Sequence, residues 1–165
     1  MRTAEVRRLT SEAFRRFGDF AALINPQAER IGDPPVEFYR DMLPLRLGAS
    51  TTASISVCRV AKRPAVVDVT EFHDQTEEGV LPLDGDVLIH VAAATPGDRP
   101  PVDGIEVFRV PRGTFVVLRR GVWHHAPFAV DRDTVNVLIV LPERTYAVDC
   151  TVRRLAGNQR VRIAD

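Results

Sequence analysis

Two stretches of the chain decide its fold: Glu71–Gly85, with the sequence EFHDQTEEGVLPLDG, and Gly113–His125, with the sequence GTFVVLRRGVWHH. Together they hold three of the four histidines. Alternate residues ahead of His73 are apolar and end in Glu71, so they form one face of a strand. Such a face predicts a strand that is packed at one end and ionisable at the other, as in the wall of a closed barrel.

Short apolar runs continue on both sides of these stretches, from about Leu43 onward. They are rich in β-branched residues, and turn signals that contain glycine separate them about every ten residues. This pattern predicts a sandwich or barrel, because no helix-length segments alternate with the runs as a parallel α/β sheet requires. The predicted strands are Ala53–Val60, Ala65–Phe72, Val87–Ala94, Ile105–Val110, Thr114–Leu118, Val135–Leu141 and Tyr146–Val152.

A short helix is predicted near the N-terminus, at about residues 10–17. Thr10 or Ser11 can cap its first turn, and Phe14 and Phe17 lie three residues apart on one face. Gly18 can close the helix in the left-handed conformation. The fold class is therefore all-β with one short N-terminal helix.

The composition argues against several classes of protein. The 165 residues include 22 basic and 22 acidic side chains, so the balanced charge argues against a nucleic-acid-binding surface. No apolar run approaches the roughly 20 residues that span a bilayer, and the N-terminus lacks the apolar stretch of a signal peptide. We therefore expect a cytoplasmic protein without nucleic-acid or membrane partners, folded as one domain over 1–165 with its barrel at about 43–163. Cys58 and Cys150 are expected to be free thiols.

The first stretch resembles the first motif of the cupin superfamily, in which a His-x-His pair is followed by a Glu and then a Gly. His73 matches the second His, Glu78 the Glu and Gly85 the Gly, whereas Glu71 stands at the position of the first His. The resemblance implies a cupin-type jelly-roll β-barrel with a polar site inside the barrel.

The second stretch resembles the second cupin motif in order and spacing. Gly113, the turn glycine Gly121 and His124 match the motif, and Arg119 replaces its usual proline. The two motifs together imply that a later antiparallel strand places His124 beside the polar groups of the first motif.

His73, Glu78 and His124 form the candidate site, and Glu71 is a fourth candidate catalytic residue. Two imidazoles and one or two carboxylates are suitable ligands for a divalent transition metal. The same groups can instead act as an acid and a base without a metal. Both interpretations stay open from the sequence.

Within the cupins, nearly the whole chain resembles the ureidoglycolate lyase family. Leu9–Phe14 and Phe17–Asp19 are similar to the family's first helix, Glu71–His73 to its Glu-Arg-His, and Leu81–Leu83 to its next strand. The most specific similarity is Gly121–Pro127, GVWHHAP, which is close to the family's Gly-x-Trp-His-His-Pro.

The resemblance implies cleavage of ureidoglycolate to glyoxylate and urea. A base must take the carbinol proton, and an acid must protonate the departing ureido nitrogen. His124 or His73 is the candidate base, and Glu71 or Glu78 is the candidate acid.

A small carboxylate substrate also requires a cationic partner. Arg59 is the candidate anchor because it has the strand parity of the apolar Ile55 and Val57, although it can equally end its strand in water. Arg40 and Arg119 are the reserve candidates.

Four further residues are interpreted from their neighbours. Trp123 is expected to pack beside the site and to contact substrate, and Glu77 is expected to face solvent. His125 must face away from His124 on a regular strand, so we expect a core or interface residue. His90 is expected to be structural or to lie at a dimer contact.

Two departures separate the chain from the family pattern. The family usually has Gln where this chain has Glu78, and a carboxylate there favours metal binding. Val135–Val140 lacks the acidic residues that the family tends to carry on a late strand.

The alternatives to the lyase function are a metal-dependent cupin enzyme of other chemistry, such as an isomerase, decarboxylase or dioxygenase, and a non-catalytic small-molecule-binding cupin. In each case we expect a homodimer, because cupins often pair through exposed strands.

Overall fold

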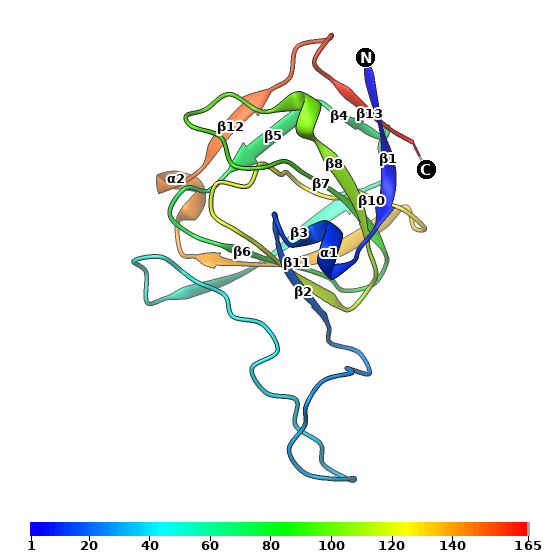
Figure 1. The fold of residues 1–165 in the computed structure, drawn as a ribbon, viewed down its shortest axis with the longest axis vertical. Helices are drawn as coiled ribbons and strands as arrows, with labels where there is room; N and C mark the ends of the chain where they lie inside the picture. The colour runs from blue at the N-terminus through cyan, green and yellow to red at the C-terminus, as the bar shows by residue number, and fades with distance from the viewer. Residues whose placement is uncertain (165) are drawn as a thin grey trace.

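Two curled β-sheets pack face to face in the computed structural model of the protein, which describes residues 1–164 (Figure 1). The larger sheet has the strand order β10-β7-β8-β1-β13-β4, and the other has the order β2-β9-β6-β11-β3. This is the cupin-type jelly roll that the sequence predicts. The elements are β1 (Arg2–Arg8), α1 (Ser11–Phe14), β2 (Gly18–Ala22), β3 (Ala53–Ala61), β4 (Val66–Val67), β5 (Val69–Phe72), β6 (Glu78–Pro82), β7 (Val87–Val91), the 3-10 helix η1 (Val102–Gly104), β8 (Glu106–Val110), β9 (Thr114–Leu118), β10 (Phe128–Ala129), β11 (Thr134–Pro142), α2 (Thr145–Val148), β12 (Thr151–Arg154) and β13 (Val161–Ala164).

An apolar cluster fills the space between the two sheets. Alternate residues of β11, including Val135, Val137 and Ile139, point into it, as the period of a strand requires. The α1 residue Phe14 packs edge-on against Phe108 of β8, with ring centroids 5.2 Å apart. The short N-terminal helix is therefore anchored by its aromatic face.

The N-terminal helix is shorter than predicted and ends at Phe14. The Thr10 side chain accepts a hydrogen bond from the Ala13 amide at 3.2 Å, so it caps the first turn as expected. Gly18 does not close the helix but begins β2, where an added Cβ atom would collide with the carbonyl oxygen of Val117. Glycine is needed at this position because β2 approaches β9 closely.

Several strands differ from their predicted bounds. Ala65–Phe72 is interrupted at Asp68, so β4 joins the larger sheet, whereas β5 pairs with β12 in a separate two-stranded sheet. Tyr146–Val152 starts in the helix α2 and only ends as β12, because Arg144 turns the chain with a φ of 63°. The sheets also begin well before residue 43, since β1 and β2 each join one of them. The many charged residues of β1 hide its alternation.

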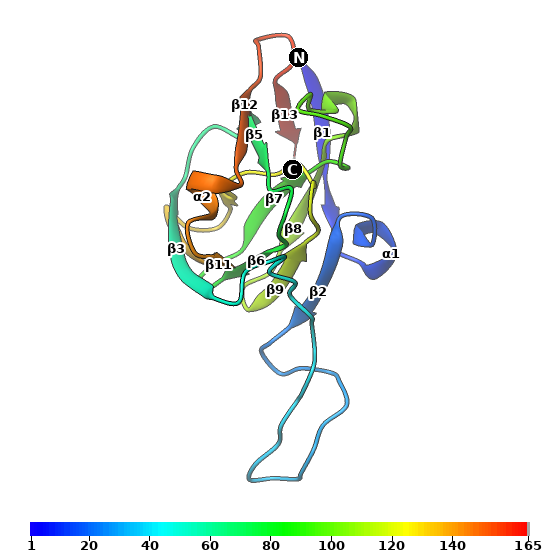
Figure 2. The same cartoon turned by 90° about the vertical axis from the view of Figure 1, so that its left-hand side faces the viewer.

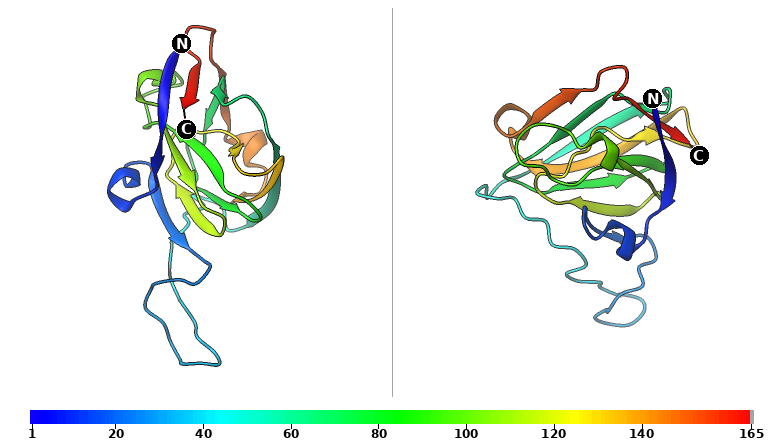
Figure 3. Two further views of the ribbon diagram at one scale, coloured as in Figure 1. Left: turned by 90° about the vertical axis from the view of Figure 1, so that its right-hand side faces the viewer. Right: turned by 45° about the horizontal axis from the view of Figure 1, so that its top comes forward.

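One long arm, residues 23–52, connects β2 to β3 and projects from the barrel (Figures 1 and 2). An isolated bridge between Ile31 and Phe38 closes its tip. The two chain ends lie on the opposite side of the molecule, where β1 and β13 pair in parallel (Figure 3). Within the described residues, no helix has the length and apolar character needed to cross a membrane.

His90 of β7 is buried in the core, with 1% of its surface exposed. Thr70 donates from Oγ1 to the carbonyl of His124, so the same Oγ1 accepts from Nε2 of His90 at 3.3 Å. Nδ1 of His90 has no hydrogen-bond partner among the described residues. Burial, reinforced by the charge of His124, lowers the pKa of His90 to about 3. His90 is thus a neutral structural histidine, and its burial within one chain removes the expected alternative of a dimer contact.

This buried histidine should make folding sensitive to acid. The pKa of His90 rises from about 3 to its ordinary 6.5 on unfolding, so the unfolded chain binds more protons between these values. The stability from the neutral side chain is complete above pH 6.5 and falls with pH, by about 3 kcal/mol near pH 4. Urea unfolding between pH 6.5 and pH 3 should show that the free energy of unfolding falls more steeply with pH for the wild type than for His90→Gln. Equal slopes in the two proteins would show that His90 is not the source of the acid sensitivity.

Candidate active site

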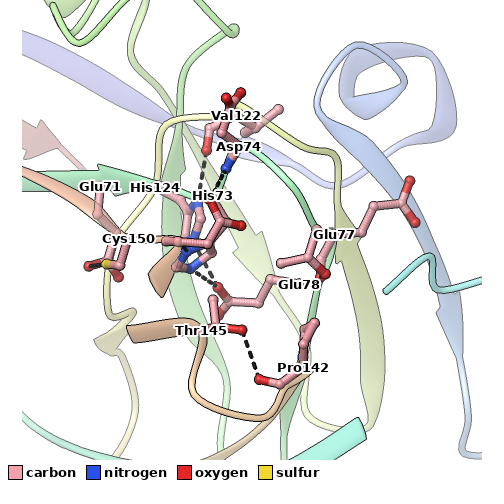
Figure 4. A network of polar contacts seen from close by, with 12 residues as sticks. Glu71, His73, Asp74, Glu77, Glu78, Val122, His124, Pro142, Thr145 and Cys150 are labelled. Atoms are coloured by element: carbon pink, nitrogen blue, oxygen red, sulfur yellow. Dashed lines mark hydrogen bonds and ion pairs between the residues drawn. The ribbon is translucent and has the colours of Figure 1, made fainter. Parts of the chain in front are cut away.

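The carboxylate of Glu78 contacts two neighbouring histidines at the centre of the site (Figure 4). Its Oε2 is 3.0 Å from Nε2 of His73 and 2.9 Å from Nε2 of His124. All three side chains are buried, with 7%, 2% and 5% of their surfaces exposed for Glu78, His73 and His124. His73 directly follows β5, Glu78 begins β6, and an isolated bridge joins His124 to Glu71 of β5. The structure therefore brings together the residues that the two motifs predict.

Backbone carbonyls fix the orientation of both imidazoles. Nδ1 of His73 donates to the carbonyl of Asp149 at 2.6 Å, and Nδ1 of His124 donates to the carbonyl of Val122 at 2.8 Å. A carbonyl only accepts hydrogen bonds, so both Nδ1 atoms carry a proton. The two Nε2 atoms therefore face one carboxylate oxygen of Glu78 and are the atoms available for chemistry.

The charges of the network favour an ionised carboxylate beside a protonated imidazole. Burial by itself raises the pKa of Glu78, but the charges of His124 and His73 and their hydrogen bonds outweigh it and lower the pKa to about 2. Burial lowers the pKa of His124, but the Glu78 carboxylate outweighs this and leaves it raised above 6.5. The proton of the pair therefore rests on His124.

Glu71 supplies a second carboxylate next to the histidines (Figure 4). The thiol of Cys150 donates to its Oε2 at 3.4 Å. Burial and the charge of Glu71 raise the pKa of Cys150 to about 12, so this thiol stays protonated. Ligand atoms of Glu71, His73 and His124 all lie within 4.8 Å of one another. Either Glu71 or Glu78 can therefore join the two histidines in a metal site.

A small cavity of about 220 Å³ opens onto Glu71, Glu78 and His124. Tyr146 of α2 forms part of its wall, with its ring centroid 6.0 Å from that of His73. Burial, together with the charges of Glu78 and Glu71, raises the pKa of Tyr146, so its hydroxyl remains a donor. The other polar residues of the wall are Cys58, Glu71, Glu78, His124 and His125, and the apolar residues are Val80, Ile89, Ala126, Pro127 and Ile139.

A larger surface hollow of about 960 Å³ lies elsewhere, beside Arg46, Phe72 and Arg119. It contains neither the two histidines nor the two carboxylates of the network. The smaller cavity is therefore the candidate active site.

Asp149, which directly follows α2, stabilises the site through hydrogen bonds that its carboxylate and its carbonyl accept. Its carboxylate accepts hydrogen bonds from the amides of Asp74 and Gln75 at 2.8 and 2.9 Å. Its carbonyl holds His73 at the same time. One residue thus fixes both the imidazole and the loop that leads from it toward Glu78.

The predicted cationic anchors lie away from the cavity. Arg59 is exposed on the outer side of β3, because this strand turns Cys58 inward, so the expectation that Arg59 points inward is wrong. Arg40 is exposed on the arm, and Arg119 pairs with Asp19 at 3.0 Å. Within residues 1–164, no Arg or Lys lines the cavity.

Trp123 packs beside the site, as expected, but does not line the cavity. It is 1% exposed, and its ring centroid lies 4.6 Å from that of Phe72. Its Nε1 donates to Thr95 Oγ1 at 2.9 Å. The indole therefore has no face turned toward a substrate in this cavity.

Two further expectations are corrected by the structure. His125 lines the cavity, because the chain leaves the strand after His124 and the alternation of faces ends there. Glu77 is buried rather than solvent-facing, since its carboxylate accepts a hydrogen bond from the Arg46 amide at 2.8 Å.

Sequence reasoning missed Cys58, Tyr146 and Asp149 as parts of the site. The parity of β3 does not reveal its inner face because both of its faces carry apolar residues. Tyr146 and Asp149 both fall within the predicted strand Tyr146–Val152, and a helix as short as α2 has no periodic signal in the sequence.

The sequence profile of the family described as Ureidoglycolate lyase matches residues 1–162. The chain belongs to the ureidoglycolate lyase family. This family member is 27% identical over 135 residues to the ureidoglycolate lyase of Stutzerimonas stutzeri (strain A1501), covering 80% of this chain and 79% of that one. It is 28% identical over 128 residues to the ureidoglycolate lyase of Escherichia coli (strain K12 / DH10B), covering 76% of this chain and 79% of that one.

Solved structures with a similar fold match more weakly. Bacillus subtilis oxalate decarboxylase aligns with a TM-score of 0.45 and 17% identity, over 63% of this chain and 24% of that chain. A vicilin from Solanum melongena aligns with a TM-score of 0.43 and 14% identity, over 64% of this chain and 26% of that chain. Neither likeness bears on the chemistry of the site in this ureidoglycolate lyase family member.

The Asp149 clamp, which consists of the hydrogen bonds that its carboxylate accepts from the amides of Asp74 and Gln75, should contribute measurably to stability. Asp149→Ala removes two hydrogen bonds to an ionised acceptor, so we expect the free energy of unfolding to fall by about 2–4 kcal/mol. The matched control is Asp131→Ala, which removes an exposed partner of Arg109 and should change it by less than about 1 kcal/mol. Denaturant unfolding measures the free energy of unfolding of both variants. Similarly small losses in Asp149→Ala and Asp131→Ala would contradict a stabilising role for the Asp149 clamp.

Proposed function

We propose that this protein cleaves ureidoglycolate to glyoxylate and urea. The observation that carries the proposal is the buried His73–Glu78–His124 network, which reaches a small cavity beside a second carboxylate, Glu71. Membership of the ureidoglycolate lyase family over residues 1–162 supports it, and the curated relatives carry the name of this activity.

Glu71 and His124 divide the proton transfers of this reaction. The Glu71 carboxylate takes the proton of the carbinol hydroxyl, and the O–H electron pair forms the C=O bond of glyoxylate as the C–N bond breaks. His124 gives its Nε2 proton to the departing ureido nitrogen, which leaves as urea. The proton on Glu71 then returns to His124 through solvent. These roles reverse the sequence-based assignment, because Glu78 raises the pKa of His124 and makes it a proton donor at rest.

The substrate carboxylate is held by neutral donors in this proposal. No Arg or Lys lines the cavity within the described chain, whereas His125 and Tyr146 both do. Burial lowers the pKa of His125, and burial raises that of Tyr146. An N–H and an O–H group are therefore available to a small anion without a fixed positive charge.

A divalent transition metal is the alternative to this acid–base mechanism, because an ion bound to Nε2 of His124 would take the place of the proton that His124 donates. Both Nε2 atoms converge on Glu78 while backbone carbonyls hold both Nδ1 atoms, an arrangement typical of histidine ligands. His73, His124 and either Glu78 or Glu71 would hold the ion, which would act as a Lewis acid toward the substrate. The same convergence favours, as a second candidate function, a metal-dependent cupin isomerase, decarboxylase or dioxygenase.

The setting of the activity belongs to the same proposal. We propose a single-domain cytoplasmic homodimer that takes a small carboxylate and has neither nucleic acid nor a membrane as its partner. The formal net charge of zero supports the absence of a nucleic-acid surface.

The activity is tested by glyoxylate release from racemic ureidoglycolate. Loss of the proton donor in His124→Ala, or of the base in Glu71→Gln, should lower kcat by about 10²–10⁴-fold. Glu77→Gln is the matched control, because Glu77 lies outside the cavity and the amide keeps one acceptor for Arg46. If wild-type protein releases no glyoxylate above the spontaneous rate, with or without added metal, the lyase proposal fails.

The metal is tested separately, by titrating metal-stripped protein with Co²⁺ and following its visible absorption. We expect binding by the wild type and loss of binding in His73→Ala. Comparing Glu78→Gln with Glu71→Gln shows which carboxylate is the third ligand, and Glu77→Gln should bind like the wild type. No absorption change in wild-type protein would contradict the metal site. Glyoxylate release that is independent of metal would assign the reaction to the acid–base pair alone.

A further inference from the structure

A second pocket, of about 430 Å³, lies at the seam between the two large sheets. Its walls come from β1 and β8 of one sheet and from β2 and β9 of the other. Small-molecule sites are typically pockets of about 300–1,000 Å³ with an apolar lining and a few polar groups. The apolar lining of this seam pocket consists of Val6, Leu9, Phe20, Ala22 and Pro111.

The seam pocket is separate from the cavity of the candidate active site, because the two share no lining residue. Val116 of β9 pairs on one side with Phe20, which lines the pocket, and on the other with Val80, which lines the cavity. The Val116 side chain is fully buried in the apolar cluster between the sheets. Packed core therefore divides the two spaces.

Thr114 places an unpaired hydroxyl group in the seam pocket. It shares the inward parity of Val116 and Leu118 on β9 and is 6% exposed. Its Oγ1 makes no hydrogen bond with any of residues 1–164, yet His90 Nδ1 is the one unpaired side-chain atom among them that is sealed from solvent. Thr114 Oγ1 therefore keeps an opening, which is the pocket that the residue lines. A hydroxyl in apolar surroundings gains from a hydrogen-bonding ligand.

Arg8 is the uncompensated cation of the seam pocket. Of the other two arginines in its wall, Arg109 pairs with Asp86 at 2.9 Å, and Arg7 pairs with Glu106. Arg8 forms no ion pair within the described chain. One guanidinium matches one carboxylate through two parallel N–H bonds, whereas a doubly charged phosphate would require a second free cation.

We propose that the seam pocket binds a small carboxylate with an apolar chain. The guanidinium of Arg8 pairs with the carboxylate, and the hydroxyl of Thr114 donates a hydrogen bond to one of its oxygen atoms. The apolar lining holds the chain of the ligand away from water. This inference does not depend on the lyase proposal, because no residue of the pocket takes part in the proton transfers.

The test is a titration of the full chain, labelled with ¹⁵N, with hexanoate, followed by the chemical shifts of the backbone amides. Saturable shifts should be largest at Ala22 and Thr114 and small at Glu78 and His124. The uncharged analogue 1-hexanol should bind at least about 10-fold more weakly, because it lacks the charge-assisted hydrogen bonds to Arg8.

Removing the cation should weaken only the charged probe. Arg8→Met keeps much of the apolar stem, so we expect about 10-fold weaker binding of hexanoate and unchanged binding of 1-hexanol. Arg160→Met is the matched control, because Arg160 is also exposed, lies outside the seam pocket and has no ion pair within residues 1–164. It should bind both probes like the wild type.

Two further variants test the remaining parts of the pocket. Thr114→Val keeps the shape of the side chain but removes the hydroxyl, and should weaken hexanoate about 5–10-fold. Ala22 faces Thr114 across β2 and β9, so Ala22→Phe should fill the pocket and abolish binding of both probes. Circular dichroism establishes that each variant is folded.

Three outcomes would overturn the proposal. Shifts in the wild type that do not saturate below about 50 mM hexanoate would show that the pocket is not a binding site. Largest shifts at Glu78 and His124 would place hexanoate in the cavity of the candidate active site instead. Equal affinity of Arg8→Met and Arg160→Met would remove Arg8 as the anion partner. Glyoxylate release is a separate readout, so failure of the lyase proposal remains distinguishable.

Discussion

The ion pair between buried Glu78 and its two histidines is the interaction on which the rest of the site depends. A carboxylate at this depth is tolerated only when its charge is compensated and its oxygen atoms are hydrogen-bonded. His73 and His124 provide both, but each imidazole must then place its other nitrogen on a backbone carbonyl. The carbonyls come from Val122 and Asp149, which lie far apart in the sequence. The segments around these residues must therefore keep their positions for the pair to exist.

The sequence predicts the jelly roll and the core of the site well, because both depend on local spacing. Strand alternation and glycine turns indicate the sheets, and the two motifs bring His73, Glu78 and His124 together. The expected inward placement of Arg59 is wrong for a physical reason: β3 and β11 carry apolar residues on both faces, so alternation does not distinguish the inner face from the outer one. The contribution of Asp149 depends on a turn and a helix of four residues, which carry no periodic signal.

The two-sided apolar character of the five-stranded sheet connects stability with function. Inside the barrel it provides the packed floor of the cavity, where Val80 and Ile139 meet the polar groups. Outside it leaves Ile55 and Val57 more than half exposed. The same strands therefore form two separate surfaces, one lining the cavity and one facing solvent.

The segment from α2 to Cys150 has an evolutionary consequence. It supplies the aromatic wall of the cavity through Tyr146, the clamp through Asp149 and the thiol on Glu71 through Cys150, whereas the histidines and carboxylates come from or beside the strands. This short connection between β11 and β12 belongs to neither large sheet, so its residues other than Asp149 can diverge at little cost to folding, whereas Asp149 must stay because it holds His73 and the loop after it. Descendants of one barrel can thus acquire new substrate preferences by exchanging residues around a retained Asp149 while they inherit the proton-transfer apparatus intact.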